Sequence, residues 1–162
     1  QGTEEGLLRL KKDVTSLEIE HAFRLCREVG IHTVAYFMIG TPVERSRKDV
    51  ADTIQYSIKL DPDFVMFNLM TPFPGTTLFD EGIRDGVLEL DPWMEFMRNP
   101  DESFKAQVWD EHFTREELRD LLDGAYRKFY WRPKFVMRNI TQIRNATDFK
   151  RKATAGLRLL TG

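Results

Sequence analysis

The chain of 162 residues has one cysteine, Cys26, and three histidines. A single cysteine cannot form a disulfide within the chain or build a cysteine-based metal site. The histidines are scattered and match no spacing typical of metal ligands. They are His21, His32 and His112. We therefore expect no metal site in this chain, and we expect Cys26 to be a buried thiol on the apolar face of a helix.

Long apolar runs are also absent. No stretch reaches the ~18 residues of a membrane span, and no signal peptide opens the chain, so we expect a cytoplasmic protein. The sequence has no Ser/His/Asp set, no paired carboxylates at a strand end and no Gly-rich phosphate loop. It therefore contains no self-contained active site. Because it starts at Gln1 with no strand before the first helix, we expect a piece of a longer chain.

An uncharged run, Thr33–Ile39, lies at the centre of the predicted fold. Its β-branched and aromatic residues favour a strand over residues 31–39, buried on both faces as in a parallel sheet. The loop Gly40-Thr41-Pro42 ends it, and a helical pattern follows over Ser46–Leu60. This order predicts one βα unit.

The same pattern returns with the run Phe64–Met70 and the loop Thr71–Thr76. We expect the two strands to be parallel neighbours with both loops at their carboxyl ends, where such sheets bind ligands. Backbone groups there could hold a flat polar ligand such as adenine, with Ile39 or Leu69 as an apolar wall. The alternative is that both loops are merely tight turns.

Helices are predicted over most of the remaining chain. Thr3 caps a helix over residues 4–12, and a capping box of Thr15 and Glu18 starts a second helix that ends near Val29. Thr77–Asp85 is a short helix, and a capping box at Thr114 starts a long one that reaches Trp131. Pro133 then separates it from helices over Phe135–Ile143 and Asp148–Leu160. Residues 88–112 show no period, and we expect an irregular segment anchored by the aromatic residues Trp93, Phe96, Phe104 and Trp109.

Positive charge is concentrated in the last part of the chain. From Gly124 onward there are ten Lys or Arg residues and one acid, Asp148. This segment carries about +9 and the rest about −11, which gives the total of −2. Such a tail could bind RNA or an acidic surface, but we favour a basic solvated face packed against an acidic body or against a missing domain. A nucleic-acid partner is therefore the unfavoured alternative.

Four motifs carry a resemblance to a known family. The segment Gln1–Lys12 is similar to the end of the fourth strand and the following helix in radical S-adenosylmethionine (radical SAM) enzymes. Phe37–Glu44 resembles their fifth-strand motif, and Leu69–Thr76 their sixth-strand loop. Phe129–Pro133 resembles the tail of the subgroup with an N-terminal cobalamin-binding domain, which includes enzymes like the anaerobic magnesium-protoporphyrin ester cyclase.

This resemblance implies an α/β fold, namely the C-terminal half of a partial (β/α)6 TIM-like barrel with an all-helical C-terminal extension. Residues 1–87 would form the second half of the barrel, 88–113 a linker and 114–162 the basic helical extension. The family cleaves S-adenosylmethionine reductively with a [4Fe-4S] cluster, whose three cysteines would lie before Gln1. The chain alone would then be inactive and would need the other half of its protein. Its exposed strand edge could also make it a dimer.

The resemblance also assigns residues to the cofactor. Gln1 and Thr3 fall where polar groups contact the methionine and ribose, and Lys12 matches the base that pairs with the carboxylate. The adenine-side positions are Ile39 and Gly40 of the first strand and Leu69 and Met70 of the second. The substrate would be a small molecule such as a tetrapyrrole, and the use of cobalamin stays open. The alternatives are a fragment of an unrelated barrel enzyme and a module that binds RNA or protein through its tail.

Overall fold

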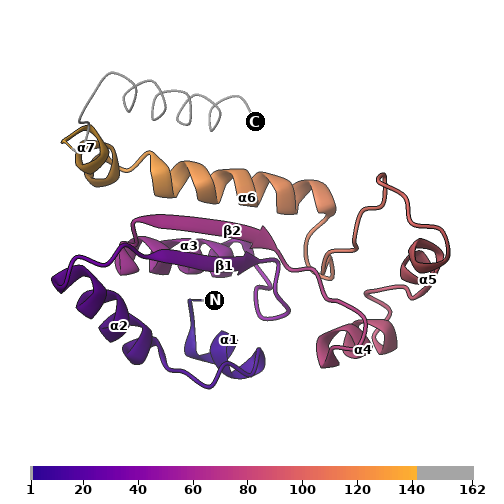
Figure 1. The fold of residues 1–162 in the computed structure, drawn as a ribbon. Coiled ribbons are helices and arrows are strands. Elements are labelled where there is room, and N and C mark those ends of the chain that lie inside the picture. Colours follow the sequence, from indigo (N-terminus) through magenta and orange to yellow (C-terminus); the bar gives the residue numbers. More distant parts are fainter. Residues whose placement is uncertain (1, 142–162) are drawn as a thin grey trace.

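The computed structural model describes residues 2–141. Seven helices and two strands follow one another in this part of the chain (Figure 1). They are α1 (Glu4–Arg9), α2 (Ser16–Glu28), β1 (Val34–Ile39), α3 (Arg47–Leu60), β2 (Phe64–Leu69), α4 (Thr77–Arg84), α5 (Asp91–Arg98), α6 (Arg115–Tyr130) and α7 (Pro133–Thr141). Gln1 and the predicted helix Asp148–Leu160 lie outside the described residues.

The two strands form a parallel sheet, as the sequence predicts. β1 and β2 pair from Val34 with Phe64 to Ile39 with Leu69, and α3 connects them. β1 begins at Val34, whereas the sequence indicated a strand from Ile31. The fold is therefore mixed α/β with a parallel layer at its centre.

Helices cover one face of this sheet. Five of the six strand side chains on this face, Phe37 and Phe67 among them, are at most 6% exposed, and Leu69 is partly buried. They pack with Val50 of α3 and with Leu118 and Phe129 of α6. Figure 1 shows α6 running alongside β2. The other face is largely open: the exposed fractions of Val34, Tyr36, Phe64 and Met66 run from 43% to 69%, and Met38 at its end is half-buried. The period of two along each strand thus divides a core face from a bare apolar face.

Short sequence patterns at the helix starts predicted the positions of the long helices. The capping boxes at Thr15 and Thr114 are both present, and α3 has a third box, formed by Ser46 and Asp49, that the sequence analysis missed. None of the helices in residues 2–141 has the length and apolar character needed to cross a membrane.

Two predictions about packing need correction. Residues 88–113 are not wholly irregular, because α5 forms from Asp91 to Arg98. Its start has Pro92 in the first turn and no side-chain cap, which explains why no capping signal marked it. Trp109 is buried as an anchor. Cys26 is only half-buried, because no residue of α2 is buried.

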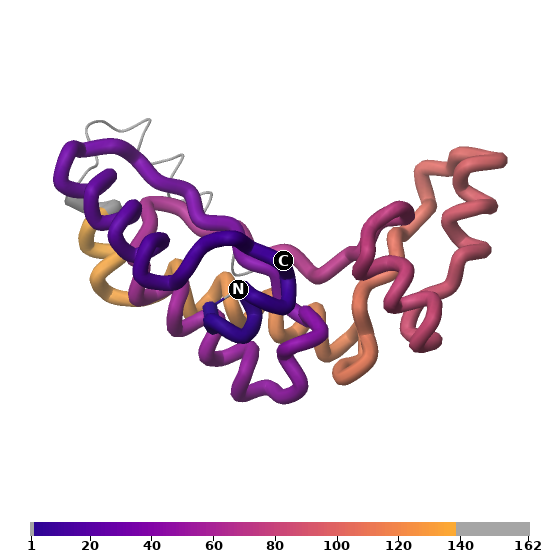
Figure 2. The backbone as a smooth tube through the Cα atoms, turned by 90° about the horizontal axis from the view of Figure 1, so that it is seen from below, coloured from indigo at the N-terminus to yellow at the C-terminus, as the bar shows by residue number. Residues whose placement is uncertain are grey.

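Figure 2 shows the backbone from below, with the segment that contains α4 and α5 extending away from the two strands. This segment is attached through a second apolar cluster, in which Met70, Phe79, Leu88 and Trp109 are buried. The backbone of Trp109 donates to the carbonyl of Met70 at 2.9 Å. The segment that contains α4 and α5 therefore starts at the carboxyl end of β2 and returns to the same place before α6 begins.

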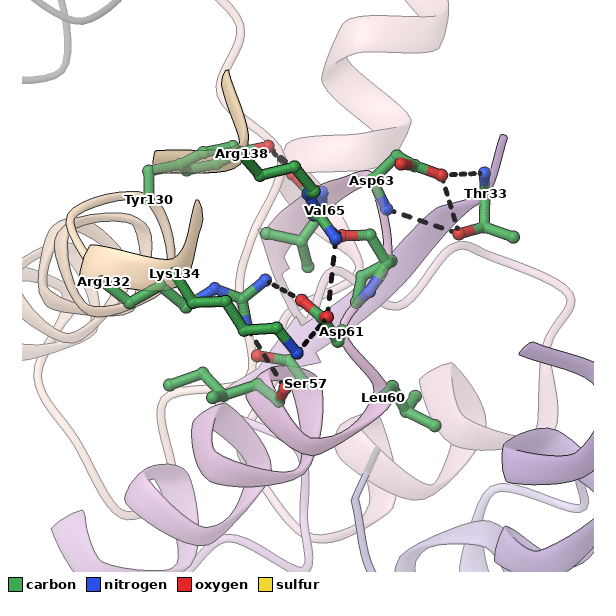
Figure 3. A network of polar contacts seen from close by, with 12 residues as sticks. Thr33, Ser57, Leu60, Asp61, Asp63, Val65, Tyr130, Arg132, Lys134 and Arg138 are labelled. Carbon is green, nitrogen blue, oxygen red and sulfur yellow. Dashed lines mark hydrogen bonds and ion pairs between the residues drawn. The ribbon is translucent and has the colours of Figure 1, made fainter. Parts of the chain in front are cut away.

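Three basic side chains converge on Asp61 at the other end of the sheet (Figure 3). Arg132 and Lys134 each lie 2.8 Å from a carboxylate oxygen, and Arg138 lies at 3.4 Å. Arg132 also donates to the carbonyl of Ile58 at 3.1 Å and lies 4.0 Å from the centre of the Phe129 ring. This part of the basic segment therefore packs against an acidic residue of the body, as we favoured. Arg144 and the basic residues after it lie outside the described part.

We expect Asp61→Asn to lower the free energy of unfolding by about 3 kcal/mol, because it leaves the Arg132 guanidinium buried without its counter-charge. Asp61 has a φ of 49°, and asparagine tolerates this left-handed conformation, so the variant isolates the effect of the charge. Urea unfolding of the 162-residue chain measures the loss. Asp85→Asn removes the carboxylate of an exposed ion pair with Arg84 and should leave stability close to wild type. Equal stability of both variants would contradict a structural role for the Asp61 cluster.

Candidate functional site

A hollow of about 300 Å³ opens at the carboxyl ends of the strands. Met38 and Met70 contribute apolar surface to it, and the end of α1 and the segment that follows β2 form its walls. The residues from α1 and the following turn are Arg9, Leu10, Lys11 and Lys12, and those after β2 are Thr71, Pro72, Phe73, Thr76, Thr77, Leu78 and Glu81. The hollow thus combines apolar surface with a rim of positive charge.

An ion pair joins the two walls. The Arg9 guanidinium lies 2.5 Å from the Glu81 carboxylate and links α1 to α4. The hydrogen bond from Arg9 lowers the pKa of Glu81, so that this carboxyl stays ionised. The Arg9 guanidinium is therefore already paired with a carboxylate of this chain.

Lys11 and Lys12 differ from Arg9. Lys11 takes a φ of 50°, and the Lys12 N–H donates to the carbonyl of Leu7 at 2.8 Å, so the chain turns sharply at the end of α1. Within residues 2–141, neither ammonium group forms an ion pair with a carboxylate, although the positive charge of Lys11 helps to lower the pKa of Glu81. The turn thus presents two cations at the rim that can bind an anionic group.

Glu44 fixes the loop after β1. One carboxylate oxygen accepts from the N–H groups of Gly40 and Thr41, at 2.9 and 3.1 Å. The other oxygen accepts from the hydroxyl of Thr53 in α3 at 2.7 Å. Glu44 is 1% exposed, and these three donors compensate for the burial of its oxygens. The sequence analysis did not single out this residue, although it ends the Phe37–Glu44 motif.

Gly40 is required for a reason other than the expected one. Its φ is +75°, and an added Cβ would lie 2.6 Å from Cδ2 of Leu118 in α6. We expected that side of Gly40 to face adenine, but it faces a core side chain. The structure therefore explains the glycine by its backbone conformation and by the close approach of α6.

The other predicted cofactor residues divide into two groups. Met70 and Lys12 both line the hollow. Ile39 does not form a wall of it, because its side chain is fully buried in the core and its carbonyl accepts from Met70 N–H at 2.8 Å. Leu69 packs partly against the same core. Thr3 caps α1 by accepting from Gly6 N–H at 3.1 Å, and Gln1 lies outside the described residues.

The described residues do not contain a metal site. No group of three or more His, Cys, Asp or Glu side chains in residues 2–141 is arranged to hold a metal ion. Cys26, on α2, does not line the hollow. The cations at the rim and the apolar surface of Met38 and Met70 suit a ligand that has an anionic group and an apolar part.

No protein-family model matches this chain. It is 34% identical to an uncharacterized methyltransferase, PH0819, of Pyrococcus horikoshii over 129 residues, which are 80% of this chain and 27% of that protein. It is 34% identical to the anaerobic magnesium-protoporphyrin IX monomethyl ester cyclase of Cereibacter sphaeroides over 74% of this chain and 18% of the enzyme. A match of 22% identity to a bacteriochlorophyllide d C-8(2)-methyltransferase of Chlorobaculum tepidum covers 44% of the chain and 16% of the enzyme. The chain thus spans about a quarter or less of the length of these relatives.

Gly40→Ala should destabilise the chain by two effects, the strain of a Cβ at positive φ and the clash with Leu118. The first costs about 1–2 kcal/mol and the second about 1–3 kcal/mol. Gly86→Ala is a matched control, because Gly86 has a φ of +74° and nothing lies within 4 Å of its added Cβ. The difference between their unfolding free energies in urea measures the clash. Equal losses in the two variants would show that Leu118 does not restrict this position.

Proposed function

The chain belongs to the radical S-adenosylmethionine family, and we propose that its hollow forms part of a site for S-adenosylmethionine in a larger enzyme. The relatives are a cyclase and methyltransferases, which supports enzyme activity for the protein that contains this chain. The single observation that carries the proposal is the unpaired Lys12 at the rim of the hollow, beside the apolar surface of Met38 and Met70.

The chemistry of the hollow fits this cofactor. S-adenosylmethionine has a carboxylate at one end and a flat adenine ring at the other. The ammonium group of Lys12 can donate a charge-assisted hydrogen bond to the carboxylate, and methionine side chains adapt well to flat apolar groups. When bound, S-adenosylmethionine supplies a methyl group or, after reduction by a [4Fe-4S] cluster, a 5′-deoxyadenosyl radical. This chain's own part is to bind and orient the molecule.

The residues of this chain do not fit a [4Fe-4S] cluster. Three thiolates are needed and Cys26 is the only cysteine in the sequence. In our proposal the cluster is therefore held by another part of the larger protein. We assign no described residue to cobalamin, which would also be bound elsewhere.

We also propose that β1, β2 and their helices are two units of a larger, partial parallel barrel that stays open at one edge. The bare apolar face of the sheet, with Tyr36 and Met66, supports this, because an apolar face of a sheet is normally covered. In a barrel this face would line the interior. The length of the relatives outside the match supports the same proposal, since 73% of the Pyrococcus protein has no counterpart in this chain and 27% has one.

The substrate that we propose is a tetrapyrrole or another large flat molecule. The names of two relatives specify a magnesium-protoporphyrin and a bacteriochlorophyllide. Phe73, which lines the hollow and is exposed, has its ring centre 5.5 Å from that of Trp93, whose ring centre lies 5.0 Å from that of Phe104. Aromatic side chains of this kind stack well on flat rings.

The test is the binding of S-adenosylmethionine to the full-length protein that contains this chain. We expect Lys12→Ala to weaken binding about 10- to 100-fold, the effect of losing a hydrogen bond to a charged group. Lys48→Ala is the control, because Lys48 lies on α3, pairs with Asp52 and does not line the hollow. Isothermal titration of both variants and the wild type gives the three dissociation constants.

Equal affinities in all three proteins would exclude Lys12 as the partner of the carboxylate. If the wild type itself fails to bind S-adenosylmethionine, the proposed cofactor is wrong.

A further inference from the structure

The two edges of the sheet differ. Phe64 N–H donates to the carbonyl of Thr33, and Met70 N–H donates to that of Ile39. Because the backbone groups of a parallel strand point alternately to its two sides, the N–H and C=O groups of Val65 and Phe67 point away from β1. An edge of this kind normally offers a template for another strand.

Two tyrosines of α6 occupy this β2 edge. The hydroxyl of Tyr130 accepts from Val65 N–H at 3.1 Å and donates to the carbonyl of the same residue at 2.8 Å. Tyr126 makes the same pair of contacts with Phe67, at 3.1 and 2.9 Å. Figure 3 shows Tyr130 and Val65. Each hydroxyl thus replaces the amide and carbonyl that a neighbouring strand would supply.

The spacing explains why two tyrosines can do this. Four residues of a helix rise about 6 Å, and two residues of a strand about 6.6 Å. Tyrosines at positions i and i+4 therefore meet strand residues at positions j and j−2 when the helix runs opposite to the strand. The two rings stack with their planes 9° apart. Burial raises the pKa of Tyr130, which keeps its hydroxyl protonated as a donor.

The β1 edge is open in contrast. Here the outward backbone groups belong to Val34, Tyr36 and Met38, and no hydrogen bond from elsewhere in residues 2–141 reaches them. Val34 and Tyr36 are also exposed, on the bare face of the sheet. A strand added at this edge would pair these groups and extend the apolar face.

We infer that Tyr126 and Tyr130 terminate the sheet at β2, so that another strand can be added at the β1 edge alone. The partner that fits the β1 edge is a parallel strand from a further βα unit of the larger protein. Sheets that begin parallel tend to stay parallel, and the relatives contain a long stretch with no counterpart in this chain. The inference depends on the backbone contacts of α6 and is independent of the cofactor.

The test removes the two hydroxyls from the 162-residue chain in Tyr126→Phe/Tyr130→Phe. The matched control is Tyr56→Phe, because Tyr56 donates to the carbonyl of Ser16 and lies away from the β2 edge. Amide hydrogen exchange is measured by NMR. In the double variant we expect exchange about tenfold faster at Val65 and Phe67, the effect of losing a hydrogen bond of ordinary strength. Met66, which points to β1, should change less.

Sedimentation velocity then tests the effect on strand addition. We expect the double variant to form larger assemblies than the wild type and Tyr56→Phe at the same concentration, because the backbone groups of Val65 and Phe67 lose their hydroxyl partners and can pair with another strand. Unchanged exchange at Val65 and Phe67 would overturn the inference. Faster exchange with no change in assembly would also overturn it, since the hydroxyls would then stabilise the strand without limiting its partners. If the double variant does not fold, Tyr126→Phe alone is measured at Phe67 by the same criteria.

Discussion

A sheet of two parallel strands is too small to be stable without other elements packed against it. In this protein the burial of one face of that sheet is the constraint on which the other features depend. Helix α6 contributes most to it, because Leu118, Ala125 and Phe129 are fully buried against the strands and α3. The same helix reaches the β2 edge with two tyrosines and closes over Gly40 with Leu118. Helix α6 thus determines the packing of the core, the state of the β2 edge and the conformation of the loop at Gly40.

The loop after β1 shows how this packing reaches the candidate site. Gly40 can sit under Leu118 because it has no Cβ, and Glu44 then accepts from the N–H groups of Gly40 and Thr41. Thr53 ties the same carboxylate to α3. The loop at the carboxyl end of β1 is therefore held from the core side. The hollow, which Met38 lines, opens on the other side.

Patterns of short range predicted much of this from the sequence. Apolar runs located β1 and β2, and capping boxes located α2 and α6, because these signals depend on residues a few positions apart. Contacts between distant residues could not be predicted in this way. The burial of Ile39, the approach of Leu118 to Gly40 and the hydroxyl of Tyr130 at Val65 depend on how α6 packs. Motif position assigned Lys12, Met70 and Ile39 to the cofactor. Lys12 and Met70 line one hollow, whereas the side chain of Ile39 is buried in the core.

The Asp61 cluster and the hollow lie at opposite ends of the strands. Asp61, with its three basic partners, lies just before β2 begins, and Thr33 and Asp63 are hydrogen-bonded at the same end. The hollow with Lys12 lies where the strands finish. In parallel α/β folds, residues at the amino ends of strands mainly support the fold, whereas those at the carboxyl ends bind and react. The motif from Phe129 to Pro133 belongs to the first kind, because Arg132 joins the helical extension to Asp61. The residues to vary for cofactor binding are therefore those around the hollow, on α1 and after β2.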